Sequence, residues 1–68
     1  MKTITGKRLC YILESKGWQL VRITGSYHIF VKPGSIMRIS VPVHGNKDLK
    51  SGLLKSIMKI ADIKEIEL

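Results

Sequence analysis

The chain has 68 residues, enough for one domain, residues 1–68, with one modest hydrophobic core, and too few for a second catalytic domain. Twelve Lys and Arg against five Asp and Glu leave a formal net charge of +7, which favours a polyanionic ligand, nucleic acid first. Cys10 is the only cysteine, which excludes an internal disulfide, and no apolar run is long enough for a signal peptide or a membrane span, so we expect a cytoplasmic protein with no membrane contact.

The first predicted element is an amphipathic helix over residues 5–16. Its apolar positions recur at the three-and-four spacing of one helix face: Leu9, Ile12 and Leu13. We expect Thr5 to be the N-cap and Gly17 to end the helix. Cys10 lies within this helix, a position that favours a small buried hydrophobe over a nucleophile.

Three short runs rich in β-branched and aromatic residues follow, and they predict an antiparallel meander. The runs cover residues 18–23, 28–32 and 36–41. Thr24-Gly25-Ser26 predicts the first turn and Pro33-Gly34-Ser35 the second. Trp18 begins the first run, and we expect it in the core or at the edge of the core.

Alternation along these runs predicts which side chains face the helices. The expected helix-facing set is Ile29 and Val31 on the second run, with Met37, Ile39 and Val41 on the third. The opposite face then carries His28, Phe30, Lys32 and Arg38. One aromatic and three phosphate-binding side chains suit an RNA-binding surface, and they also suit an ordinary solvated face.

A second helix is expected to begin near Asp48 or Ser51, either of which is able to cap it. Its expected buried stripe is Leu53, Leu54, Ile57, Met58 and Ala61. The alternating tail, residues 63–68, predicts an edge strand or a segment that docks on a partner. The order helix, three strands, helix predicts an α+β fold with both helices packed on one face of a three-stranded antiparallel sheet.

The stretch Gly25-Ser26-Tyr27-His28 places an imidazole directly after a turn in a strongly basic chain. RNA cleavage needs neither a metal nor a protein nucleophile, because the 2′-hydroxyl attacks the adjacent phosphorus once a base takes its proton. His28 is therefore the candidate catalytic base or acid, and the alternative is a surface or capping imidazole. Ser26 and the turn amides are expected to contact phosphate. Arg22, Lys32 and Arg38 are expected to supply positive charge to the RNA.

A second motif, Pro42-Val43-His44-Gly45, follows the third run. His44 is a candidate partner acid, an RNA phosphate contact or a loop residue that hydrogen-bonds the backbone. Tyr27 is able to stack on a base, donate a hydrogen bond or shield the turn. Since Cys10, His28 and His44 lack the paired spacing of zinc ligands, we expect no metal site and no cofactor.

Together these motifs resemble the HicA family of toxin ribonucleases, also described as YcfA-like proteins. The resemblance covers almost the whole chain, through Thr5-Gly6-Lys7, Gly17-Trp18, Val21-Arg22, Gly25-Ser26-Tyr27-His28, Val41-Pro42-Val43-His44-Gly45, Leu49-Lys50-Ser51-Gly52-Leu53-Leu54 and Ile57. It implies a double-stranded-RNA-binding-domain-like fold, cleavage of messenger RNA by one essential histidine, and inhibition by a HicB-type antitoxin encoded beside it. That histidine corresponds to His28, although many members read Gly-Ser-His where Tyr27 intervenes here.

The resulting hypothesis is a single HicA-like toxin domain that acts as a ribosome- and metal-independent endoribonuclease on messenger RNA. We expect it to form a homodimer or a toxin–antitoxin hetero-oligomer, since a small core gains stability from a partner. One alternative is a non-catalytic double-stranded-RNA-binding module, which would concentrate Lys at the start of the second helix, where this chain has only Lys47 and Lys50. Another is a purely protein-binding subunit, whose RNA affinity would lack steep salt dependence.

Overall fold

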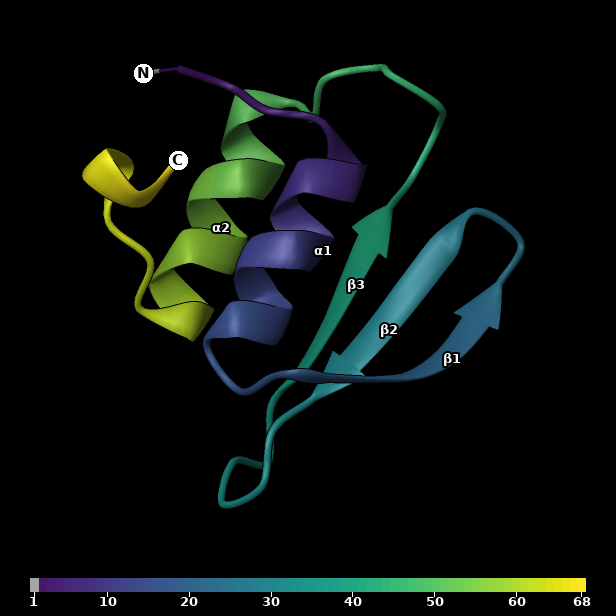
Figure 1. Ribbon diagram of the computed structural model, residues 1–68, viewed down its shortest axis with the longest axis vertical. Helices are drawn as coiled ribbons and strands as arrows, with labels where there is room; N and C mark the ends of the chain where they lie inside the picture. The colour runs from purple at the N-terminus through teal and green to yellow at the C-terminus, as the bar shows by residue number, and fades with distance from the viewer. Residues whose placement is uncertain (1) are drawn as a thin grey trace.

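The computed structural model describes residues 2–68, and its helices and strands follow the predicted order (Figure 1). The elements are α1 (Gly6–Ser15), β1 (Gln19–Thr24), β2 (Tyr27–Val31), β3 (Arg38–Pro42) and α2 (Ser51–Ala61), followed by the short 3₁₀ helix η1 (Glu65–Glu67). The strands form an antiparallel sheet in the order β1-β2-β3. This confirms the α+β architecture.

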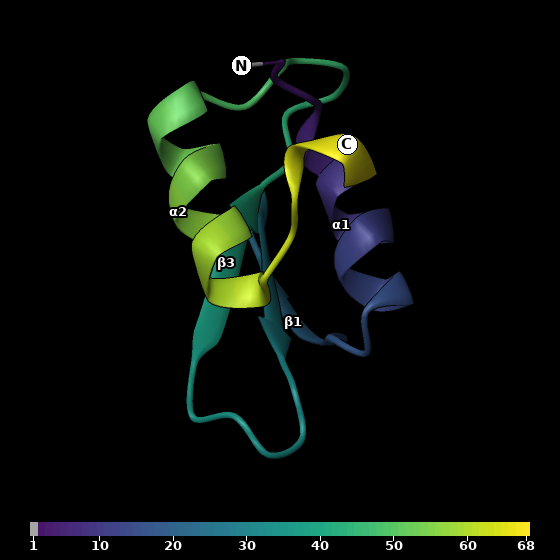
Figure 2. The same cartoon turned by 90° about the vertical axis from the view of Figure 1, so that its left-hand side faces the viewer.

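Both helices lie on the same side of the sheet, and the view turned by 90° shows the chain after α2 crossing between them (Figures 1 and 2). One hydrophobic core joins the two layers. The strands and the residue before β1 contribute Trp18, Phe30, Ile39 and Val41 to this core. The helices contribute Leu9, Ile12, Leu13, Leu54, Ile57, Met58 and Ala61. Burial of this shared apolar surface holds the helices against the sheet.

Local signals correctly predicted how α1 begins and ends. The Thr5 hydroxyl accepts a hydrogen bond from the Arg8 amide at 3.1 Å, so Thr5 is the N-cap. Gly17 follows the helix at φ +94°, a left-handed conformation that glycine adopts without the steric cost of a Cβ. The chain then enters β1 with Trp18 buried, as expected.

The predicted faces of β2 were wrong. Phe30 is fully buried and pairs with the buried Ile39 of β3, so the even-numbered side chains of β2 face the helices. Ile29 pairs with the exposed Ser40 and lies on the open face. Both sets of alternating positions on β2 contain bulky apolar residues, so alternation alone did not distinguish them. His28 consequently lies on the helix-covered side of the sheet.

Several smaller predictions were also wrong, at or near element ends. Met37 precedes β3 and is exposed, and Leu53 of α2 is more than one-third exposed. α2 begins at Ser51, one of the two expected starts, but neither Asp48 nor Ser51 caps it: the N-cap is Lys50, without a side-chain cap, and Asp48 pairs with Thr5 in an isolated bridge.

The tail is not an edge strand. Ile63 joins the core, η1 follows, and Glu67 forms an ion pair with Lys16 at 2.7 Å. The segment therefore docks on its own chain, beside the end of α1. Within residues 2–68, the helices are too short or too polar to span a membrane.

Candidate functional site

Strand pairing brings the two histidine motifs to the same end of the sheet. The β1–β2 turn packs against the chain that leaves β3, where the Val43 amide donates to the Ser26 carbonyl at 2.8 Å. The Ser26 hydroxyl lies 3.5 Å from Nε2 of His44. Residues 18 positions apart in the sequence thus form one polar pair, and His28 follows Ser26 by two residues.

The loop that carries His44 is held at both of its ends. The Lys47 amide donates to the His44 carbonyl at 3.0 Å, closing a tight turn in which Gly45 has φ +55°. Beyond that turn, the Leu49 amide donates to the Ile4 carbonyl at 2.8 Å, and the Thr3 hydroxyl donates to the Leu49 carbonyl. These bonds between distant segments position the imidazole of His44 on an otherwise exposed loop.

Gly6 allows α1 to approach this end of the sheet closely. A Cβ at Gly6 would lie 2.2 Å from the carbonyl oxygen of Pro42 and 3.2 Å from the Cα of Val43. Only a residue without a side chain fits such a contact. The start of α1 therefore sets the position of the chain from Pro42 to His44.

His28 lies on β2, the central strand, opposite Ile23 of β1 and Val41 of β3. Its side chain is half-buried, next to the core but still open to solvent. It follows Ser26 by two residues, so the candidate base, the Ser26 hydroxyl and the His44 imidazole lie at one end of the molecule. An imidazole with solvent access is able to exchange protons with a bound RNA.

The three expected cations do not gather around His28. Arg22 pairs with Ile29 and Arg38 with Val31, which places both arginines on the open face of the sheet. Lys32 follows the far end of β2, four residues from His28, a separation of about 13 Å along an extended chain. Its side chain lies near Gly17. The positive charge that sequence reasoning assigned to one site is divided between both faces.

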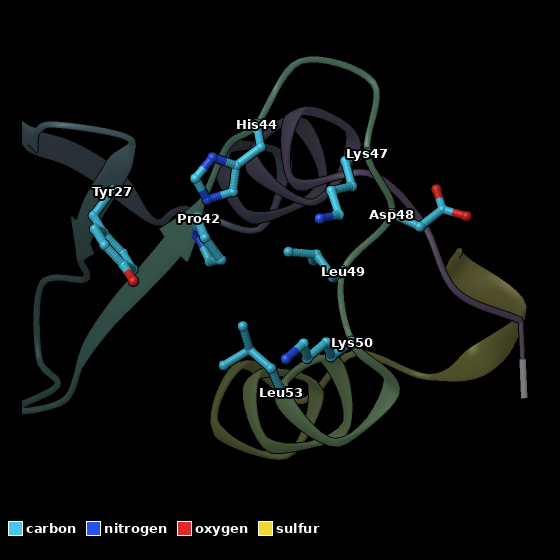
Figure 3. Close-up of a pocket in the computed structure, with 8 residues that line it drawn as sticks. All are labelled: Tyr27, Pro42, His44, Lys47, Asp48, Leu49, Lys50 and Leu53. Atoms are coloured by element: carbon cyan, nitrogen blue, oxygen red, sulfur yellow. The ribbon is translucent and has the colours of Figure 1, made fainter.

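A pocket of about 290 Å³ opens beside the Ser26–His44 pair (Figure 3). It is lined by Tyr27, Pro42, His44, Lys47, Asp48, Leu49, Lys50 and Leu53. In the sequence, the signal for such a site was the concentration of polar residues between positions 44 and 50. The contribution of Leu53 was missed because its helical spacing indicated the core.

Within residues 2–68, neither the Cys10 thiol nor a cluster of acidic groups forms a competing site. Burial and the nearby Glu14 carboxylate raise the pKa of Cys10 to about 11, so its thiol stays protonated near neutral pH. This agrees with the expected structural role. Among the residues that the structure describes, no three His, Cys, Asp or Glu side chains cluster as metal ligands would.

Comparison with known proteins identifies the family. A family model described as "HicA toxin of bacterial toxin-antitoxin" matches residues 6–63. A solved structure, the "HicA3 and HicB3 toxin-antitoxin complex", contains a chain that superposes with a TM-score of 0.66 at 36% identity, covering 87% of this chain and 94% of that one. No curated protein matches. The chain belongs to the HicA family of bacterial toxin–antitoxin toxins.

Proposed function

We propose that this toxin is an endoribonuclease that cleaves messenger RNA with His28 as its catalytic acid or base. The observation that carries the proposal is the placement of the two histidine motifs at one end of the sheet, where the Ser26 hydroxyl, two residues before His28, lies 3.5 Å from Nε2 of His44. Membership of a toxin family agrees with it. An excess of cationic side chains favours an RNA substrate over a neutral one.

The chemistry that fits these groups is transfer of the phosphoryl group within the RNA itself. A base takes the proton from a 2′-hydroxyl, whose oxygen then bonds to the adjacent phosphorus. The bond from phosphorus to the 5′-oxygen breaks, and an acid protonates that leaving oxygen. The products are a 2′,3′-cyclic phosphate and a 5′-hydroxyl end. His28 takes one of the two proton transfers, and His44 is the candidate for the other.

The remaining expected site residues act on the RNA backbone. The Ser26 hydroxyl and the amides of the turn bind an oxygen of the scissile phosphate. Because Arg22, Lys32 and Arg38 lie away from His28, we propose that they attract and hold flanking phosphates. Such contacts raise affinity without joining the proton transfers.

We also propose a HicB-type antitoxin as the protein partner. The similar solved chain was determined in a complex with HicB3. β1 supports a protein contact independently, because all six of its residues are exposed and Leu20, Val21 and Ile23 are apolar. Exposed apolar side chains on an edge strand are typical of a surface that a partner covers.

The test is cleavage of a defined RNA by the purified protein in the presence of a chelator. General acid–base catalysis contributes about 10²- to 10⁴-fold, so His28→Ala should lose that much activity while its affinity for uncleavable RNA stays near the wild-type value. A 2′-deoxy nucleotide at the cleaved position should block the reaction. Cleavage by His28→Ala at the wild-type rate, or undiminished cutting of the deoxy substrate, would refute the mechanism.

A further inference from the structure

The pocket beside His44 has the chemistry of a nucleotide site, which is a different role from the proton transfers assigned to His28. Pro42, Leu49 and Leu53 give it an apolar floor, and Tyr27 forms one wall with its ring half-exposed (Figure 3). Figure 3 shows the side chains of Lys47 and Lys50 extending into the same space, opposite Tyr27. An apolar floor, an aromatic ring and two cations match a base and its phosphate.

The pocket adjoins the proposed active site at His44, while His28 is not among the residues that line it. His44 lines it and also lies within 3.5 Å of the Ser26 hydroxyl, two residues before His28. Tyr27 lines it and directly precedes His28 in β2, so the two side chains leave the strand on opposite faces. An RNA strand with its cleaved bond at this end of the sheet would therefore place a flanking nucleotide at the pocket.

The charge and the volume of the pocket indicate which ligand it would bind. The pocket carries Lys47 and Lys50 against the single carboxylate of Asp48, so it favours an anionic group. Its volume of about 290 Å³ is small, at the lower end of ligand sites, and suits one nucleotide rather than a paired duplex. Bases in duplex RNA are stacked and paired, so only an unpaired base is able to reach Tyr27.

We propose that this pocket binds one unpaired nucleotide of the RNA next to the cleaved bond, with its base stacked on Tyr27 and its phosphate held by Lys47 and Lys50. This proposal rests on the proposed function and adds a preference for single-stranded RNA. Tyr27 is a substrate-binding residue in this arrangement, separate from the proton transfer at His28.

The decisive experiment measures the coupling between Tyr27 and a base. Fluorescence anisotropy gives the Kd of a short single-stranded RNA that carries 2′-O-methyl groups throughout, which prevents attack by the 2′-hydroxyl. Tyr27→Ala should weaken binding about fivefold or more, the smaller end of the usual effect of removing a stacking residue. Tyr27→Phe keeps the ring and should stay within about twofold of wild type. Tyr11→Ala removes the other tyrosine, exposed on α1 outside the pocket, and should also stay within that range.

The second part removes the base instead of the ring. An abasic nucleotide is placed at successive positions of the same RNA, and one position should weaken wild-type binding about fivefold or more. That loss should disappear in Tyr27→Ala, because the partner of the base is already gone. Lys50→Ala should lower the slope of log K against log salt by about one, and Lys59→Ala, at the far end of α2, should lower it less.

Three outcomes would overturn the nucleotide pocket: wild-type affinity in Tyr27→Ala, an equal loss in Tyr27→Phe, or an abasic effect that persists in Tyr27→Ala. A Tyr27→Ala variant that binds RNA normally and loses a HicB-type protein would assign the pocket to the antitoxin, against the proposal. If cleavage depends on His28 and no coupling is found, only the pocket assignment fails. If wild type neither cleaves nor binds RNA, the proposed function fails as well.

Discussion

Replacing Gly6 by alanine tests the contact that positions the end of β3. The new Cβ would lie 2.2 Å from the Pro42 carbonyl oxygen, and real Cβ atoms essentially never approach closer than 3.0 Å, so α1 and β3 must separate by about 0.8 Å. Overpacking of this kind costs about 1–3 kcal/mol. Alanine recovers up to about 1 kcal/mol through its higher helix propensity. The two ranges combine to a net destabilisation of about 0–3 kcal/mol, centred on about 1–2 kcal/mol.

Gly52→Ala is the matched control. Gly52 lies in the first turn of α2, as Gly6 lies in the first turn of α1, but a Cβ there meets no atom within 4 Å. Helix propensity then acts alone, so this variant should be as stable as wild type or gain up to about 1 kcal/mol. The difference that this pair of variants tests is the backbone packed against Gly6, which Gly52 lacks.

The assay is urea unfolding at 25 °C, followed by the fluorescence of Trp18, the only tryptophan, which is buried. With m about 1 kcal/mol per M, Gly6→Ala should move the midpoint down by about 1–2 M. That is a substantial change, because a domain of this size is stable by about 3–10 kcal/mol. A Gly6→Ala midpoint at or above the wild-type value would refute the close approach of α1 to Pro42.

Three further predictions test the core, the thiol and the tail. Phe30→Leu should lower the free energy of unfolding, measured in urea, by about 1 kcal/mol or more, and Ile29→Leu by less than half of that, because only Phe30 is fully buried. The reverse order would support the assignment of faces that was made from alternation. Cys10 should react with iodoacetamide far more slowly than a free thiol at pH 8 and accelerate as pH approaches its raised pKa of about 11, and reaction at the rate of a free thiol would contradict that shift. The hydrogen bond from Lys16 lowers the pKa of Glu67, so their ion pair should help to dock the tail at pH values above the usual glutamate range and be lost as pH falls through the lowered pKa. An NMR titration should show the Glu67 pKa rising in Lys16→Ala. An unchanged Glu67 pKa would show that the ion pair does not cause the shift.

The elements themselves followed from local sequence. Thr5 and Gly17 mark the ends of α1 through side-chain capping and a positive φ, which involve only neighbouring residues. Gly25 and Ser26 form the two-residue connection between the paired Thr24 and Tyr27. Such signals need no knowledge of the rest of the chain, which is why the helix–strand order was correct.

The candidate site could be predicted from the sequence only in part. The residue types of Ser26, His28 and His44 indicated acid–base chemistry on a polyanion, but the 3.5 Å approach of Ser26 to His44 depends on the pairing of β2 with β3. The pocket depends further on where α2 packs, because it uses Leu53 and Lys50. Contacts between residues far apart in sequence are set by packing, which no local pattern encodes.

The amino-acid sequence by itself determined the α+β class, the turns and the two histidine motifs, since their signals lie within a few neighbouring residues, and it determined the net charge, which is a sum over the chain. The tertiary structure decided which side of β2 is buried. Because Phe30 enters the core, His28 lies on the helix-covered side, and Arg22 and Arg38 lie on the other. A strand with bulky apolar residues on both faces is able to bury either one, and the burial of Phe30 against Ile39 and the helices selects between them.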